Sequence, residues 1–158
     1  KSGKTDDRVN FVNKLINITA NAKFDVYGIN NIQPIWADHY FKTIANAKMG
    51  LNLSRGEAIK HYSSDRITQI VGNGLVCLID EKTEYRDFFN DKEMVFYKSI
   101  NDLSEKILKV SNDEKLRKTL GKNGKEKYMK YFNSTLVAEF IINKTLGINN
   151  EKKFLWNN

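Results

Sequence analysis

The chain has 158 residues, the size of one domain, and its 41% hydrophobic and 28% charged residues are typical of a soluble globular protein. No apolar run approaches the roughly 20 residues that a membrane helix needs, which excludes a transmembrane segment. The net charge of +7 and the pI near 9.4 fit nucleic acid, an anionic membrane surface or a phosphate-bearing ligand. We expect no nucleic-acid binding, because the aromatic residues do not interleave with Lys and Arg.

The cysteine content points to a reducing compartment. The single cysteine, Cys77, lies within an apolar run and cannot form an internal disulfide, so we expect a buried core residue. We therefore expect the protein either free in the cytoplasm or peripheral to the inner face of the membrane.

The first half of the chain alternates between helical and extended patterns. The first helix is expected to turn one apolar face inward, made of Val9, Val12, Ile16 and Ala20 with Phe11 and Leu15 beside it. In chain order the expected elements are a helix over 6–20, a strand over 24–28, a helix over 37–47, a strand over 49–53 and a polar loop over 54–64.

The second half continues the alternation and then becomes helical. Residues 75–79 are uniformly apolar, which is typical of a parallel strand covered on both faces, and Asp80 follows them. Ser99 with Asp102, and Ser111 with Glu114, have the spacing of capping boxes. The expected elements are a helix over 65–72 that ends at Gly72-Asn73-Gly74, a strand over 75–79, a short helix over 84–89, a strand over 94–97, and helices over 101–110, 113–131 and 134–146.

This order predicts an α/β fold: a Rossmann-like parallel sheet with helices on both faces and ligands at the carboxyl ends of the strands. We expect one such domain over residues 1–147. A tail over 148–158, with Phe154, Leu155 and Trp156, is expected to dock on a missing N-terminal half of the protein or to be disordered. A doubly wound domain normally opens with a strand, so we expect a further strand before Lys1.

One block resembles a known family. The run Tyr62-Ser-Ser-Asp-Arg-Ile-Thr-Gln-Ile-Val-Gly-Asn-Gly-Leu-Val-Cys-Leu-Ile-Asp80 resembles the donor-site helix and strand of group 1 glycosyltransferases, in the subfamily with a Ser-Asp-Arg start. Flanking residues 47–55 and 88–106 resemble the neighbouring segments. The resemblance implies the C-terminal, donor-binding half of a GT-B enzyme, with a nucleotide-diphosphate sugar as donor and the acceptor held by an N-terminal half.

The resemblance also implies residue roles. The superfamily has two acids eight residues apart, one near the transferred sugar and one on the donor ribose. Here Gln69 stands at the ribose position and His61 at the sugar position. Gln69 still both donates and accepts hydrogen bonds, whereas His61 lacks a permanent negative charge.

The residue chemistry independently favours a diphosphate site at the start of the 65–72 helix. Helix amino termini present unpaired N–H groups and positive partial charge. Ser63 and Ser64 would add hydroxyls there, and Arg66 a cation able to hold two oxygens. Arg55 would approach from the preceding loop. Since no Asp-x-Asp motif is present, we expect no metal and no cofactor besides the sugar-nucleotide substrate, and the catalytic group stays unassigned.

Two other readings stay open. Ser2-Gly-Lys-Thr5 matches the end of a P-loop, and the apolar strand ending in Asp80 and Glu81 mimics acids that hold Mg²⁺. A P-loop-type nucleotide-binding fragment would fit this pair of features. Alternatively, the missing acids at positions 61 and 69 fit a non-catalytic binding module that keeps a degenerate donor site.

Overall fold

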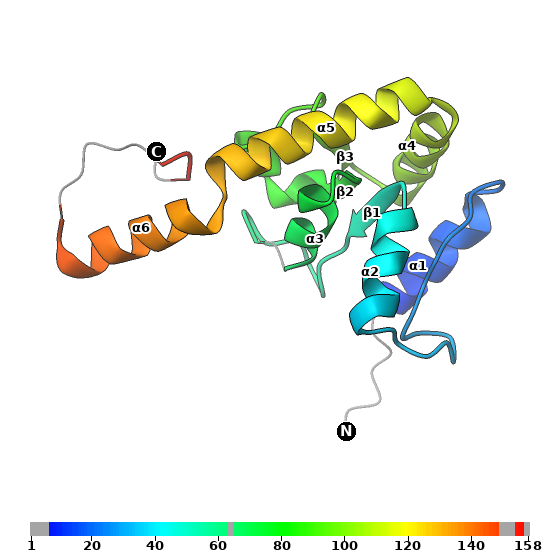
Figure 1. Cartoon of the computed structure of the whole chain (residues 1–158). Helices are drawn as coiled ribbons and strands as arrows, with labels where there is room; N and C mark the ends of the chain where they lie inside the picture. Colours follow the sequence, from blue (N-terminus) through cyan, green and yellow to red (C-terminus); the bar gives the residue numbers. More distant parts are fainter. Residues whose placement is uncertain (1–6, 63–64, 149–153, 157–158) are drawn as a thin grey trace.

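A computed structural model describes residues 7–62, 65–148 and 154–156 (Figure 1). Within them the elements, in chain order, are α1 (Asp7–Ile18), α2 (Ala37–Asn46), β1 (Met49–Asn52), α3 (Arg66–Gly72), β2 (Val76–Asp80), the 3-10 turns η1 (Glu81–Thr83) and η2 (Tyr85–Asp87), β3 (Val95–Tyr97), α4 (Ile100–Asn112), α5 (Glu114–Tyr131) and α6 (Ser134–Leu146).

The three strands form one parallel sheet in the order β1-β2-β3. Met49 pairs with Val76, and Leu78 pairs with Val95. β2 is the central strand, and its first four residues are buried, because helices cover it on both sides. The uniformly apolar pattern of this strand therefore predicted its place correctly, and the fold is the expected α/β Rossmann-like domain.

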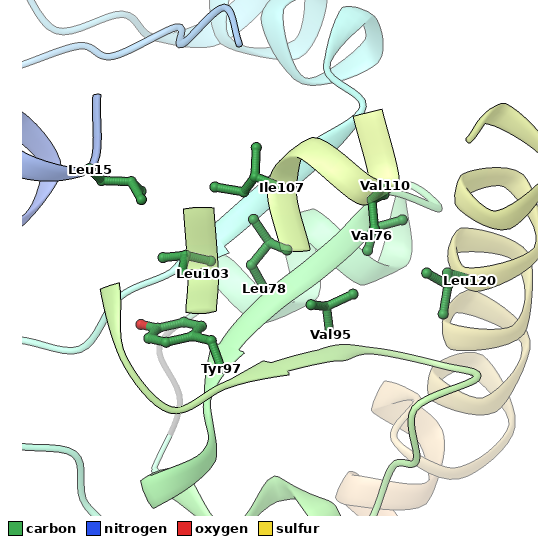
Figure 2. Packing of buried hydrophobic residues seen from close by; sticks show 9 residues of the cluster. All are labelled: Leu15, Val76, Leu78, Val95, Tyr97, Leu103, Ile107, Val110 and Leu120. Carbon is green, nitrogen blue, oxygen red and sulfur yellow. The ribbon is translucent and has the colours of Figure 1, made fainter. Parts of the chain in front are cut away.

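One face of the sheet packs against α1 and α4. Figure 2 shows this cluster, in which Leu78 and Val95 of the sheet meet Leu103 and Ile107 of α4 and Leu15 of α1. Leu103 is fully buried, and burying a side chain of this kind contributes about 1.5–3 kcal/mol. Leu15 is the residue of α1 that is fully buried, whereas Ala20, which we expected to face inward, is exposed. The buried face of the helix is therefore centred on Leu15 and is rotated from the predicted one.

The opposite face packs against α3 and the second half of α5. Its buried cluster joins Ile70 and Val71 of α3 to Cys77, Ile79 and Phe96 of the strands, with Tyr128 and Phe132 packed against it. Cys77 is 1% exposed, as expected, and burial raises the pKa of its thiol to about 12. The thiol is therefore an unreactive core group.

Two glycines let α5 approach the amino end of the sheet. A Cβ atom on Gly121 would overlap the carbonyl oxygen of Gly74, which precedes β2. A Cβ atom on Gly124 would lie 2.5 Å from the carbonyl oxygen of Glu93, which precedes β3. The backbone of α5 therefore contacts the backbone of both turns directly, and a side chain at either position would push the helix away.

The helix caps agree with the sequence in one case and differ in the other. The Ser99 hydroxyl accepts a hydrogen bond from the N–H of Asp102 and caps α4, as expected. Ser111 lies within the last turn of α4 and caps nothing. Asp113 instead accepts from the N–H of Leu116 at the start of α5, because its position immediately precedes the first helical residue.

Two predicted elements were wrong. Half-buried and exposed residues alternate over 24–27, but residues 24–28 form no strand and pair with no described strand, and Gly28 has a left-handed backbone with φ of 77°. An alternating pattern shows which face is covered, whereas a strand also needs a neighbour to accept its hydrogen bonds. The expected helix over 84–89 is replaced by η1 and η2, because Glu84 between them has a left-handed backbone with φ of 53°.

The chain leaves the sheet along α5 and continues into α6, which extends away from the other helices (Figure 1). Phe154 and Trp156 of the tail return to this helix, where both contact Phe140, and Trp156 also contacts Phe132. Phe154 is 6% exposed. Within the described ranges, no helix combines the length and apolar character needed to span a membrane.

Candidate functional site

The carboxyl edge of the sheet gathers polar residues. β1, β2 and β3 end at Asn52, Asp80 and Tyr97, and the segments that follow each strand lie at this edge because the strands are parallel. Asn52 is 4% exposed, although its side chain is polar. This is the edge at which open parallel sheets bind their ligands.

Arg66 is the predicted residue whose position the structure defines most clearly. Its Nη1 donates a hydrogen bond of 2.9 Å to the carbonyl oxygen of Leu53, the residue after β1. Arg66 is half-buried and makes no ion pair with any described residue. A guanidinium has five N–H donors, so this contact fixes the group at the carboxyl edge and leaves donors for an anion.

The other predicted contacts lie around it. Arg55 follows two residues after Leu53, in an exposed bend before Gly56, and its side chain has no hydrogen-bond or ion-pair partner among the described residues. Gln69 is half-buried and shares a helix face with Arg66, three residues away. Two further predicted residues, Ser63 and Ser64, lie outside the described residues.

His61 is held in place from several directions. Its Nε2 lies 2.9 Å from Oδ2 of Asp87, its backbone N–H donates to the carbonyl oxygen of Thr83, and its ring lies 4.5 Å from the ring of Phe88. Its backbone is left-handed, with φ of 56°. Residues other than glycine rarely adopt this conformation without compensating contacts, and such strain concentrates at functional sites.

These contacts tie the loop before α3 to the end of β2. The Asp80 carboxylate accepts the N–H of Lys82, and the Thr83 hydroxyl donates to the Asp80 carbonyl oxygen, which fixes η1 on the strand. Lys60, next to His61, reaches Glu84 at 2.5 Å and Asp87 at 3.7 Å. The hydrogen bond to Glu84 raises the pKa of Lys60, so this amine stays charged.

Sequence reasoning missed two features of this edge. It placed Asp87 and Phe88 in a short helix with no role, although an acid three residues after Glu84 and close to a strand's carboxyl end was a usable signal. It also gave no role to Tyr97, which is 2% exposed and whose hydroxyl has no hydrogen-bond partner among the residues that the structure describes. Burial raises the pKa of Tyr97, so the hydroxyl stays protonated.

Elsewhere on the described surface we find no second candidate site. Two open hollows lie along α5 and α6, the first lined by Lys127 and Tyr131 and the second by Ala138 and Ile142, and neither includes a predicted site residue. In the part of the chain that the structure describes, no three His, Cys, Asp or Glu side chains come together as a metal site.

Comparison with known proteins shows the family of the chain. Residues 8–143 match the family of proteins described as glycosyl transferase-like. The chain belongs to this family. The match covers all three strands and reaches from α1 into α6, so the glycosyltransferase-like domain includes both the sheet and the helices that cover it. No curated protein and no solved structure matches the glycosyltransferase-like chain.

Proposed function

We propose that this glycosyltransferase-like domain binds a nucleotide-diphosphate sugar at the carboxyl edge of its sheet and donates the sugar to an acceptor held by a partner half. The observation that carries the proposal is the hydrogen bond between Arg66 and Leu53, which holds a cation at this edge. A diphosphate suits a guanidinium because two of its N–H groups can bind two phosphate oxygens at once.

Each predicted residue near Arg66 is assigned to one part of the donor. Arg66 binds the diphosphate together with Arg55, Ser63 and Ser64. Gln69, on the same helix face as Arg66, binds the ribose hydroxyls. His61 contacts the sugar, since it precedes Arg66 on the loop that η1 and η2 hold at the edge.

This arrangement favours the departure of the nucleoside diphosphate. In glycosyl transfer the bond between the anomeric carbon and the phosphate oxygen breaks, and negative charge grows on the diphosphate. Contacts that strengthen with this charge lower the barrier. Arg66 and Arg55 supply the positive charge that stabilises the leaving diphosphate, so the proposal includes neither a metal ion nor a cofactor. The catalytic group and the acceptor site belong to the proposed partner half, so we expect this domain alone to bind donor without transferring sugar.

The location in the cell and the partner are part of the same proposal. A cytoplasmic domain fits the buried, unpaired Cys77. The exposed apolar residues of α6 are the surface that we propose for contact with the acceptor-binding half: Val137, Ile141, Ile142 and Leu146.

The test is calorimetric titration of the chain with uridine and guanosine diphosphate, followed by the same titration of Arg66→Ala. We expect one of the two nucleotides to bind, and the substitution to cost about 1.5–3 kcal/mol of binding free energy, the value of a hydrogen bond to a charged group. No binding of either nucleotide to the unsubstituted chain contradicts the proposal.

Arg117→Ala is the matched control. Arg117 is also half-buried and also donates from Nη1 to a backbone carbonyl oxygen, that of Ser111, but it lies at the start of α5. Its loss removes the same kind of contact and leaves the carboxyl edge intact. Equal losses of nucleotide affinity in the two variants would exclude Arg66 as a ligand and point to general destabilisation.

A second candidate, the non-catalytic binding module, is supported by Gln69 and His61 in place of the two family acids. Both candidates predict nucleotide binding. Sugar transfer by this domain joined to its acceptor-binding half separates them, because the module would bind donor and transfer nothing.

A further inference from the structure

The pairing of His61 with Asp87 has a chemical consequence for the sugar contact. An ionised carboxylate has only acceptor atoms, so the 2.9 Å contact between Nε2 and Oδ2 of Asp87 requires the hydrogen to be on Nε2. In a neutral imidazole the other nitrogen, Nδ1, then carries the lone pair. Within the described residues Nδ1 has no hydrogen-bond partner, and the side chain is 35% exposed.

We infer that Asp87 is a positioning residue for donor-sugar recognition: it holds His61 in the tautomer whose Nδ1 accepts a hydrogen bond from a hydroxyl of the transferred sugar. This inference rests on the proposed function. A sugar hydroxyl is the matching ligand because it can donate, whereas a phosphate oxygen at neutral pH only accepts. The His61–Asp87 pair thus presents an acceptor atom supported by a nearby negative charge.

The geometry around the pair limits the freedom of the ring. The Phe88 ring lies against the imidazole, and the hydrogen bond from the His61 backbone to Thr83 fixes the left-handed loop. The charge of Asp87 is shared with Lys60, whose Nζ lies 3.7 Å away. Lys60 lies closer to Glu84, at 2.5 Å, so His61 is the nearer partner of Asp87.

Two neighbouring acids give a matched pair of variants. Glu84 and Asp87 are three residues apart, are 51% and 52% exposed at their side chains, and both contact Lys60. Asp87 contacts His61 and Glu84 does not. Asp87→Asn and Glu84→Gln therefore remove the same charge from the same segment, and only the first alters the partner of the imidazole.

The first measurement compares affinities. Calorimetry would give the dissociation constants for uridine diphosphate against UDP-glucose and for guanosine diphosphate against GDP-mannose, and the ratio within each pair measures the gain from the sugar. We expect Asp87→Asn to lower this gain about tenfold, the effect of one hydrogen bond to a charge-supported group, while the diphosphate alone binds unchanged. Glu84→Gln should change neither value.

The second measurement needs no substitution in the site. Long-range proton–nitrogen correlation spectra of the chain report which ring nitrogen carries hydrogen, and His39→Gln assigns the signals, since His39 is the other histidine. We expect the Nε2–H tautomer of His61, and a shift of Nδ1 when the sugar nucleotide is added but not when the diphosphate alone is added.

The possible results distinguish a failure of the proposed function from a failure of the inference about Asp87. If neither diphosphate binds, the proposed function and this inference both fail. If a diphosphate binds but the sugar gain is the same in Asp87→Asn and Glu84→Gln, or His61 carries its hydrogen on Nδ1, the inference alone is overturned. Unchanged urea unfolding of Asp87→Asn confirms that the comparison is made on folded protein.

Discussion

The two ends of the same sheet are built differently. At the amino end, Leu75 and Met94 are buried and the backbone of α5 rests on the turns before β2 and β3, so there is room for glycine alone at positions 121 and 124. At the carboxyl end the contacts are polar, and the backbone of His61 is left-handed. Close packing at one end of the domain stabilises the fold, while the other end carries the polar groups that we propose bind the ligand.

The largest expected effect tests the amino end. We expect Gly121→Ala to lower the free energy of unfolding, because a Cβ atom there overlaps the backbone of Gly74. Overpacking costs about 1–3 kcal/mol, and the better helix propensity of Ala returns at most about 1 kcal/mol. Urea unfolding measures the change. The control is Gly72→Ala, whose Cβ would meet the Met129 side chain at an ordinary 3.8 Å; equal stability of the two variants would contradict the packing argument.

The next effect has the opposite sign and lies at the carboxyl end. We expect Tyr97→Phe to raise the free energy of unfolding by about 1 kcal/mol, because it removes a buried hydroxyl that has no partner within residues 7–62, 65–148 and 154–156. Thermal unfolding would show a higher midpoint. A loss of stability in Tyr97→Phe would show that the hydroxyl makes a favourable contact, and the contrast between the two ends would then be smaller than described.

The smallest effect concerns an ion pair that joins the segment after β2 to the turn before β3. Arg86 donates two hydrogen bonds of 2.9 Å to Asp91, which lowers the pKa of that carboxyl, although burial opposes the shift. A carboxyl whose pKa is lowered in the folded state stabilises the protein above its unfolded pKa, and this contribution is lost as the pH falls through the folded value.

We therefore expect the stability difference between the unsubstituted chain and Asp91→Asn to shrink as the pH falls below about 4, the ordinary range of an aspartate. The difference at neutral pH should stay under about 1 kcal/mol, since the Asp91 side chain is 71% exposed. Urea unfolding at several pH values measures it. A difference that does not depend on pH would show that the pair contributes through packing of Arg86 on Phe96 instead.

The sequence by itself determined most of the local elements of this protein. The apolar run over 75–79 predicted the central buried strand, and the cap at Ser99 marked the start of α4, because periodicity and capping depend on residues only a few positions apart. The block from Tyr62 to Asp80 also indicated a glycosyltransferase, and the chain does belong to the glycosyl transferase-like family.

The tertiary structure alone decided which residues meet. Residues 24–28 have the alternation of a strand, yet no described strand pairs with them, because pairing depends on a neighbour that the local pattern cannot name. The contact between His61 and Asp87 joins residues 26 positions apart, one in the loop before α3 and the other in the segment after β2. The candidate site is therefore a property of the packed sheet edge, where segments distant in sequence are brought together.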